Sequence, residues 1–224
     1  TGNERFAWDS YRRFVQMFGD VVLGMKPESK EDIDPFEEIM EHMKEEKGIE
    51  LDTEFTVNDL KELVKRFKEA VKKQTGHDFP TNPWDQLWGS VMAVFDSWQN
   101  PRAIYYRALN QIPEEWGTAV NVQAMVFGNM GSNSGTGVAF TRDAGTGEDI
   151  FNGEYLVDAQ GEDVVAGIRT PQQITKEGSL RWAKLAQVSE ADRAAKFPSL
   201  EELMPSIYKE LDTIQQKLED HYKD

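Results

Sequence analysis

The amino-acid sequence predicts an α+β fold in which helices come first, a small antiparallel sheet follows and helices close the chain. Apolar residues recur at helical spacing through most of residues 1–110, which is typical of helices with one buried face. Residues 111–175 change to short β-rich runs separated by Gly, Asn and Ser, which indicates strands and hairpin loops. Helical spacing returns in residues 176–224. We therefore expect a helical subdomain (1–110), a strand-rich subdomain (111–175) and C-terminal helices (176–224) that pack on it.

Capping residues and glycines predict the bounds of the first helices. Apolar side chains from Asn3 to about Met17 share one face, and Gly19 is predicted to end that helix. Asp34 followed by Pro35 is an N-cap with proline at the first helical position, and Gly48 is expected to stop the helix that follows.

Three more helix starts follow along the chain. Thr56, with Asp59 three residues later, predicts a capped helix that runs to Gly76. Asn82 and Pro83 repeat the cap-plus-proline signal before an aromatic-rich face in residues 84–98, which we interpret as core. Pro101 is predicted to start a short helix.

The strand-rich part contains four short β-type runs, and the closing part contains two helical patterns. The predicted strands are residues 118–127, 137–141, 153–158 and 163–165. The predicted closing helices are residues 190–196 and 199–222.

Composition excludes several classes of function. The chain has 25 Lys and Arg against 40 Asp and Glu, a formal charge of −15, which argues against a nucleic-acid partner because a phosphate backbone is bound by clustered positive charge. It contains no Cys, which rules out disulfides, thiol catalysis and thiolate zinc sites and fits a reducing, cytoplasmic setting. No apolar run approaches the roughly 20 residues of a membrane span, so no membrane partner is expected. The chain starts at Thr1 and stops inside a helical pattern, so we expect a piece of a longer protein.

The glycine-rich loop at residues 128–137 (GNMGSNSGTG) is the most suggestive candidate site. Glycines and small hydroxyl residues allow backbone N–H groups to converge on a phosphate, although a plain flexible hairpin explains the same residues. Arg102, Arg107, Arg142 and Arg169 lie near predicted element ends and could meet phosphate charge. Surface pairing with the abundant carboxylates is the alternative.

Carboxylates and histidines predict neither a metal site nor a catalytic residue in this chain. Glu154, Asp158, Glu162 and Asp163 lie within a short span and could serve metal or acid–base chemistry, but one solvated sheet face accounts for them equally. The three histidines, which have no partner at metal or catalytic spacing and are interpreted as surface residues, are His42, His77 and His221.

Five long stretches of the chain closely resemble the nucleotide-binding region of pyruvate phosphate dikinases. They are AWDSYRRFVQMFGDVV (7–22), FDSWQNPRAIYYR (95–107), GTAVNVQAMVFGN (117–129), SGTGVAFTR (134–142) and GEYLVDAQGEDVVAGIRTP (153–171). The resemblance runs almost end to end. Phosphoenolpyruvate synthases resemble the chain only in the strand–loop–strand part, where the similarity is weaker, and they lack the motif AQGEDVVAGIRTP.

The resemblance implies an ATP-grasp-like nucleotide-binding region of a three-part, homodimeric, cytoplasmic enzyme. In that family the region transfers a phosphoryl group from Mg²⁺-bound ATP to a histidine on a swivelling domain of the same chain, and a third domain makes phosphoenolpyruvate from pyruvate. The metal-binding glutamate and the phosphorylated histidine of the family have no counterpart here. The resemblance therefore implies that this piece alone is inactive.

The same resemblance implies positions for the nucleotide. The strand with Gln123, Met125 and Val126 would line the adenine, and the residues that would cover the phosphates are Gly135, Thr136, Gly137, Thr141 and Arg142. The family usually has Thr-Arg-Asn-Pro-Ser-Thr-Gly where this chain has TRDAGTG (141–147), so the stiffening proline is missing and a floppier loop is expected. Arg102 and Glu154 lie in stretches that closely resemble the family, and we expect these two residues to help dock the swivelling domain.

Two other functions remain open at the level of sequence. The helices of residues 1–110, with the acidic run at residues 28–50, could form a non-catalytic interaction module. The chain could also be the equivalent region of a phosphoenolpyruvate synthase.

Overall fold

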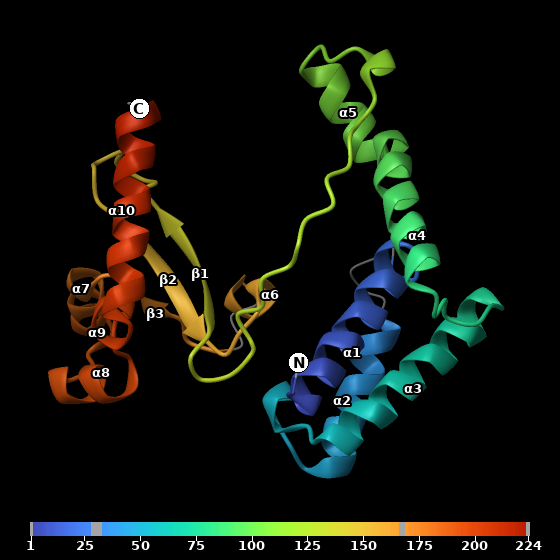
Figure 1. Ribbon diagram of the computed structural model, residues 1–224, viewed down its shortest axis with the longest axis horizontal. Coiled ribbons are helices and arrows are strands. Elements are labelled where there is room, and N and C mark those ends of the chain that lie inside the picture. Colours follow the sequence, from blue (N-terminus) through green and yellow to red (C-terminus); the bar gives the residue numbers. More distant parts are fainter. Residues whose placement is uncertain (1, 28–32, 166–168, 223–224) are drawn as a thin grey trace. The chain divides into compact units, whose positions relative to one another are not determined.

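The computed structural model describes residues 2–27, 33–165 and 169–222, so the first five residues of the acidic run at 28–50 lie outside the described residues. Two compact units make up the chain, Thr1–Ala124 and Met125–Asp224, and the elements of each are labelled in Figure 1. The predicted α+β fold is confirmed, since the described residues form mostly helices together with a three-stranded antiparallel sheet. The three-part division at residues 110 and 175 stays a prediction.

The first unit is helical. Its elements are α1 (Glu4–Val21), α2 (Pro35–Lys47), η1 (Asp52–Glu54), α3 (Val57–Thr75), α4 (Pro83–Asp96), η2 (Ser97–Gln99), α5 (Pro101–Leu109) and η3 (Glu114–Trp116). The caps predicted at Asp34, Thr56 and Asn82 form as hydrogen bonds, and Asn3 caps α1 in the same way: each side chain accepts from backbone N–H groups at the start of its helix. Local sequence therefore determines where these helices begin.

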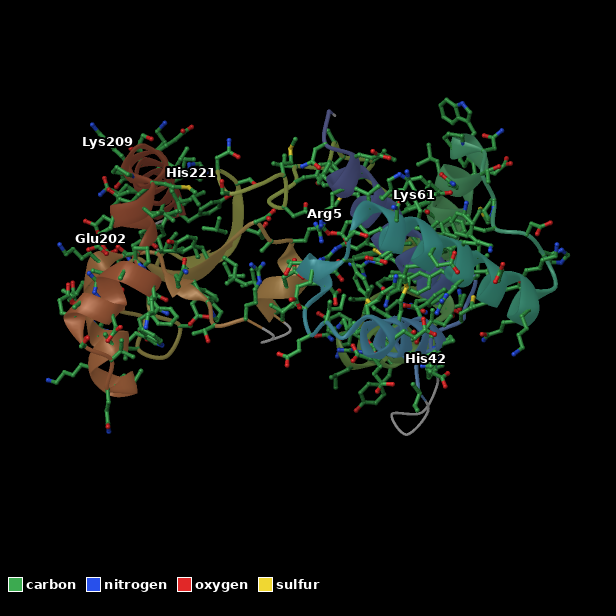
Figure 2. The ribbon with its side chains drawn as sticks, turned by 90° about the horizontal axis from the view of Figure 1, so that it is seen from below. Arg5, His42, Lys61, Glu202, Lys209 and His221 are labelled. Atoms are coloured by element: carbon green, nitrogen blue, oxygen red, sulfur yellow. The ribbon has the colours of Figure 1, made fainter. Side chains whose placement is uncertain are left out.

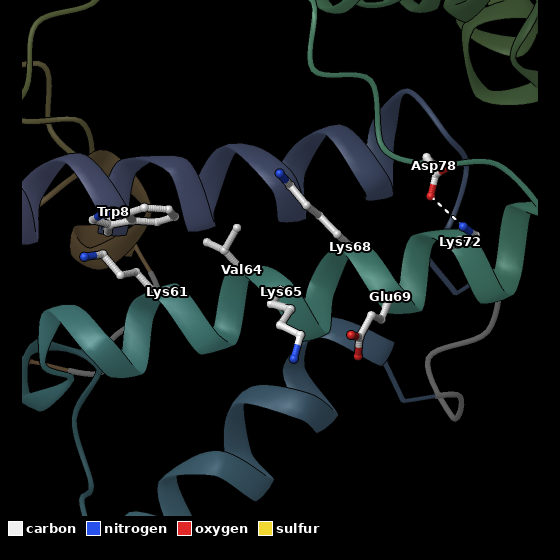
Figure 3. A pocket seen from close by; sticks show the side chains of 8 residues that line it. All are labelled: Trp8, Lys61, Val64, Lys65, Lys68, Glu69, Lys72 and Asp78. Atoms are coloured by element: carbon white, nitrogen blue, oxygen red, sulfur yellow. Dashed lines mark ion pairs between the residues drawn. The ribbon is translucent and has the colours of Figure 1, made fainter.

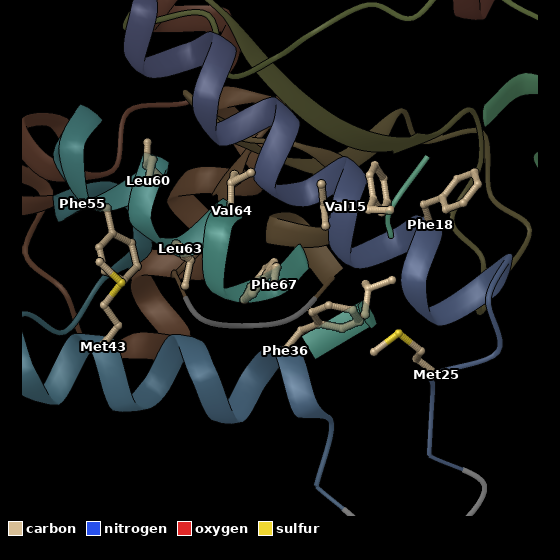
Figure 4. Packing of buried hydrophobic residues seen from close by; sticks show 12 residues of the cluster. Val15, Phe18, Met25, Phe36, Met43, Phe55, Leu60, Leu63, Val64 and Phe67 are labelled. Carbon is tan, nitrogen blue, oxygen red and sulfur yellow. The ribbon is translucent and has the colours of Figure 1, made fainter. Parts of the chain in front are cut away.

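A buried cluster between α1, α2 and α3 forms the core of this unit (Figure 4). At its centre the rings of Phe36 and Phe67 meet edge to face, with centroids 4.9 Å apart. The buried members of the cluster are Val15, Phe18, Met25, Phe36, Met43, Phe55, Leu60, Leu63, Val64, Phe67, Val71 and Phe79.

The prediction that Gly19 ends the first helix is wrong, because α1 continues through it to Val21. Gly19 is buried, and a Cβ atom built on it would lie 2.7 Å from Cε2 of Phe36. Gly19 is therefore needed because α2 approaches α1 closely at this position. From sequence alone, a glycine in this role cannot be distinguished from a glycine that ends a helix.

The prediction that residues 84–98 form core is also wrong. None of the side chains of α4 is buried, and Trp84 and Trp88 are 68% and 61% exposed. One side of the helix does contact α1, since Gly89 lies close to the ring of Phe18. The amphipathic pattern correctly indicates an apolar face, but whether another element covers that face depends on the tertiary structure.

The second unit holds the sheet. Its elements are β1 (Gly135–Phe140), β2 (Asn152–Val157), α6 (Gly161–Val165), β3 (Gln172–Gln173), α7 (Lys176–Ala186), α8 (Glu190–Lys196), α9 (Leu200–Leu203) and α10 (Pro205–Tyr222). β1 and β2 pair antiparallel with Gly137 opposite Tyr155, and β3 pairs with β2. The sheet packs against α9 and α10 through a cluster centred on Tyr155, Ile174 and Leu200.

Three predicted elements of this part are corrected. Residues 118–127 form no strand, because an alternating pattern becomes a strand only when a neighbouring strand pairs with it. Residues 163–165 belong to α6, where the Asp163 carboxylate accepts from the N–H of Gln160 at 2.7 Å and turns the chain. The single helix predicted for residues 199–222 breaks at Met204, because Pro205 disfavours helical backbone in the residue before it.

Candidate functional site

The glycine-rich hairpin of the second unit is the candidate site. Gly135 and Gly137 of β1 lie so close to β2 that a Cβ atom on them would be 2.9 Å from the Leu156 carbonyl and 2.6 Å from the Glu154 carbonyl, respectively. These two glycines therefore serve the strand pairing. Their predicted contact with phosphate stays a prediction.

Side-chain hydroxyls hold the loop that precedes β1. The Ser134 hydroxyl accepts from the N–H groups of Met130 and Gly131 at 3.0 and 3.1 Å. The Thr136 hydroxyl donates to the Ala159 carbonyl at 2.7 Å, and the Ala159 N–H donates to the Gly128 carbonyl at 3.0 Å. The loop is thus a hydrogen-bonded structure, and two of its amide groups are already engaged by Ser134.

Arg142 follows β1 and contacts α10. Its guanidinium forms an ion pair with Glu219 at 2.6 Å and donates to the Gly147 carbonyl at 3.2 Å. The hydroxyl of Thr141 and the charge of Arg142 together hold the pKa of the Glu219 carboxyl below its usual value. The Nε atom of Arg142 is buried and has no hydrogen-bond partner among the residues that the structure describes.

The turn after Arg142 is closed without the proline of the resembled family. The Asp143 carboxylate accepts from the N–H groups of Gly145 and Thr146, both at 2.9 Å. These bonds, that from Thr146 first, lower the pKa of Asp143. Hydrogen bonds therefore close this turn, and the floppier loop expected from the missing proline stays a prediction.

The predicted adenine-lining residues lie in the irregular segment that joins the two units. Gln123, Met125 and Val126 are exposed, Val126 to 93%. The boundary between the units falls within this segment, after Ala124.

The two predicted docking residues belong to different units. Arg102 is exposed near the start of α5 and lines a hollow of about 610 Å³ together with Trp98, Tyr105 and Tyr106. Glu154 is exposed on β2 and accepts a hydrogen bond from Gln173 at 3.0 Å.

Two of the four candidate arginines have structural roles instead. Arg107 is 5% exposed, stacks over the Trp98 ring at 4.1 Å and donates to the Trp98 carbonyl. Arg169 donates to the carbonyls of Val157 and Asp158 at 3.1 and 3.0 Å. Sequence reasoning also missed Glu219, since the acidic residues of α10 carry no local signal that one of them meets Arg142.

Among residues 2–27, 33–165 and 169–222, no group of three or more His, Asp or Glu side chains is placed to hold a metal ion. The side chains of His42 on α2 and His221 on α10 are labelled in Figure 2. The Nε2 atom of His42 lies 3.3 Å from Oε1 of Glu46. None of the helices that the structure describes combines the length and the apolar character needed to cross a membrane.

Comparison with known proteins gives consistent matches. A family model described as pyruvate phosphate dikinase, AMP/ATP-binding domain, matches residues 50–224. Pyruvate, phosphate dikinases of Rhizobium meliloti (strain 1021) and Clostridium symbiosum are each 53% identical over 100% of the chain, and the match covers 23% and 22% of their lengths. The chloroplastic pyruvate, phosphate dikinase of Mesembryanthemum crystallinum is 49% identical over 99% of the chain and 20% of its own length. The chain thus spans about a fifth of the length of these relatives.

Proposed function

The chain belongs to the pyruvate phosphate dikinase family, and we propose that it supplies part of the ATP-binding region of such an enzyme. The full-length protein would phosphorylate a histidine on a swivelling domain and convert ATP, pyruvate and phosphate to AMP, phosphoenolpyruvate and diphosphate. The observation that carries the proposal is the family match over residues 50–224, which includes the glycine-rich hairpin and Arg142.

In this proposal the two halves of the nucleotide meet different parts of the chain. The adenine contacts Gln123, Met125 and Val126. The segment that carries these residues is exposed, and its backbone groups take no part in strand pairing, so they remain accessible to the edge of the base. The phosphates lie near the hairpin, at Gly135, Thr136, Gly137 and Thr141, and the positive charge of Arg142, which directly follows β1, supports this placement.

Mg²⁺ would accompany ATP, since phosphoryl transfer relies on positioning and on neutralisation of phosphate charge. Its ligands are expected in the other parts of the longer protein, which is why we propose that these 224 residues alone have no activity. We also propose a homodimeric full-length enzyme. Its location would be cytoplasmic in a bacterial cell, whereas plant relatives are described as chloroplastic.

Calorimetric titration of the 224-residue chain with Mg·ATP tests the adenine contact. We expect weak, saturable binding that Val126→Asp and Gln123→Ala each weaken at least about tenfold, a loss of roughly 1.4 kcal/mol. The matched control is Leu185→Asp, which places the same charge at an 80% exposed apolar residue of α7. Unchanged affinity in Val126→Asp, or an equal loss in the control, contradicts the assignment.

Docking of the swivelling domain through Arg102 and Glu154 is the second part of the proposal. Both side chains are exposed and could form charge pairs with a partner domain. In the full-length enzyme, Arg102→Glu or Glu154→Arg should slow the ATP half-reaction several-fold and leave the phosphoenolpyruvate half-reaction unchanged. Arg181→Glu, at an exposed ion pair of α7, is the control. Equal slowing of both half-reactions would remove the docking role.

One observation favours an additional, non-catalytic role for the first unit. The outward face of α4 exposes Trp84, Trp88, Met92 and Phe95, and large exposed apolar faces are typical of interaction surfaces. Such a role is compatible with the nucleotide-binding proposal and does not replace it. The alternative of a phosphoenolpyruvate synthase finds no support, since the reported relatives are all pyruvate, phosphate dikinases.

A further inference from the structure

Helix α3 carries a row of positive charge in an otherwise acidic chain. Lys61, Lys65, Lys68 and Lys72 line a groove of about 470 Å³ between α3 and α1 (Figure 3). Their spacing of four, three and four residues brings them to one side of the helix over about 16 Å. The chain as a whole has a formal charge of −15, so this row needs a specific explanation.

Aromatic rings hold two of these ammonium groups in place. Lys61 lies 5.6 Å from the centroid of the Trp8 ring, and Lys68 lies 4.8 Å from that of Tyr11 and 5.7 Å from that of Phe79. Lys61 and Lys68 extend from α3 on either side of Val64, and Trp8 forms the wall supplied by α1 (Figure 3). Cation–π contacts restrict flexible lysine side chains, so less entropy is lost when a ligand binds them.

Carboxylates neutralise only the ends of the row. Lys61 pairs with Glu4 at 2.7 Å, and Lys72 pairs with Asp78 at 2.9 Å. Within the part of the chain that the structure describes, Lys65 and Lys68 have no carboxylate at ion-pair distance. Lys65 and Lys68 therefore form no direct ion pair with a described residue, and Glu69 is the carboxylate that lines the groove beside them.

We propose that this groove binds a compact phosphate-bearing anion, with Lys65 and Lys68 as its charge partners and Lys61 as a further donor. Ammonium groups are effective point-charge partners for phosphate, and the volume lies within the roughly 300–1,000 Å³ of small-molecule sites. The anion is inorganic diphosphate or the diphosphate part of a nucleotide. An extended polyanion fits less well, because Glu4 and Asp78 lie at the two ends of the row and Glu69 at its edge.

The residues that line this groove are different from those of the proposed nucleotide site, so substitutions can change one set of side chains and leave the other intact. Its existence does not depend on the proposed function. Each can therefore be tested while the other is unchanged.

The test is a calorimetric titration of the 224-residue chain with inorganic diphosphate at constant ionic strength, together with the NMR shift of the Trp8 indole N–H. We expect saturable binding at one site and a shift of that signal. Lys65→Gln/Lys68→Gln should weaken binding at least about tenfold. The matched control is Lys73→Gln/Lys184→Gln, which removes the same charge from two exposed lysines outside the groove and should leave the affinity unchanged.

A parallel titration with ADP on Val126→Asp, in which the proposed adenine contact is removed, distinguishes the two sources of the phosphate. ADP binding equal to that of diphosphate indicates recognition of phosphate alone, and tighter binding indicates that the base also contacts the groove. Absence of saturable diphosphate binding, or equal weakening by the groove and control substitutions, overturns the proposal.

Discussion

Replacing Gly153 with Ala is expected to unfold the β1–β2 hairpin and to destabilise the second unit by about 3–5 kcal/mol. Gly153 has φ of 152°, which L residues rarely adopt. A Cβ atom there would meet the Val138 carbonyl and lie 2.8 Å from both Ala139 Cα and Ile174 Cδ1. The backbone strain and the overlap add, because neither the neighbouring strand nor Ile174 in the core can move without loss of packing.

Hydrogen exchange followed by mass spectrometry checks this prediction, since it reports each segment separately. Amides of residues 135–157 should lose protection in Gly153→Ala, while those of α1 and α3 in the other unit keep theirs. Gly161→Ala is the control, because a Cβ atom there meets nothing within 4 Å. Retained protection across 135–157 would show that the hairpin tolerates the methyl group.

Loss of the Arg193 guanidinium should destabilise the second unit by about 2–4 kcal/mol. This side chain is 1% exposed and joins three helices. It forms an ion pair with Glu202 of α9 at 2.7 Å and with Glu190 of its own helix α8 at 2.8 Å, and it donates to the Ser179 hydroxyl of α7 at 2.9 Å. Arg193→Met keeps most of the volume but leaves Glu202 without its main partner.

Thermal unfolding followed by circular dichroism measures this effect. Lys176→Met is the matched control, since Lys176 contacts the same carboxylate at 3.6 Å from an exposed position and should contribute at most about 1 kcal/mol. Comparable losses of unfolding free energy in the two variants would mean that burial does not strengthen the ion pair between Arg193 and Glu202.

The same pair predicts a pH dependence. Hydrogen bonds from Arg193 first, and from Ser199, lower the pKa of Glu202 from 4.5 to about 2. Because the folded-state pKa is depressed, the stabilisation is complete above pH 4.5 and is lost as pH falls toward 2. The stability difference between the native chain and Arg193→Met should therefore shrink over this interval, and a constant difference from pH 5 to pH 2 would contradict the assigned pKa.

Much of the local structure follows from short-range sequence signals. Helices α2 to α4 begin where Asp34, Thr56 and Asn82 predict, because a cap needs only the backbone N–H groups two or three residues ahead. Strands β1 and β2 lie within about two residues of their predicted bounds. Family membership also follows from the sequence, since a long characteristic motif such as GEYLVDAQGEDVVAGIRTP can be identified without knowledge of how the chain packs.

The candidate site could be predicted only in part. The glycine-rich loop and Arg142 are visible in the sequence, but the hydroxyl bonds of Ser134 and Thr136 and the pairing with Glu219 join residues up to 77 positions apart. The sequence offers Arg107 and Arg169 as further candidates for phosphate, yet each donates to backbone carbonyls, and Arg107 is also buried. Which acceptors each arginine meets depends on the residues that the fold brings near it.

The sequence by itself thus determined the fold class, the starts of α2 to α5, strands β1 and β2 and the family, because caps, periodicity and characteristic motifs act over a few residues. Only the tertiary structure decided the role of Gly19 against Phe36, the exposure of the aromatic face of α4 and the absence of a strand at residues 118–127. Burial and strand pairing require a partner surface, and that surface is contributed by residues distant in the chain.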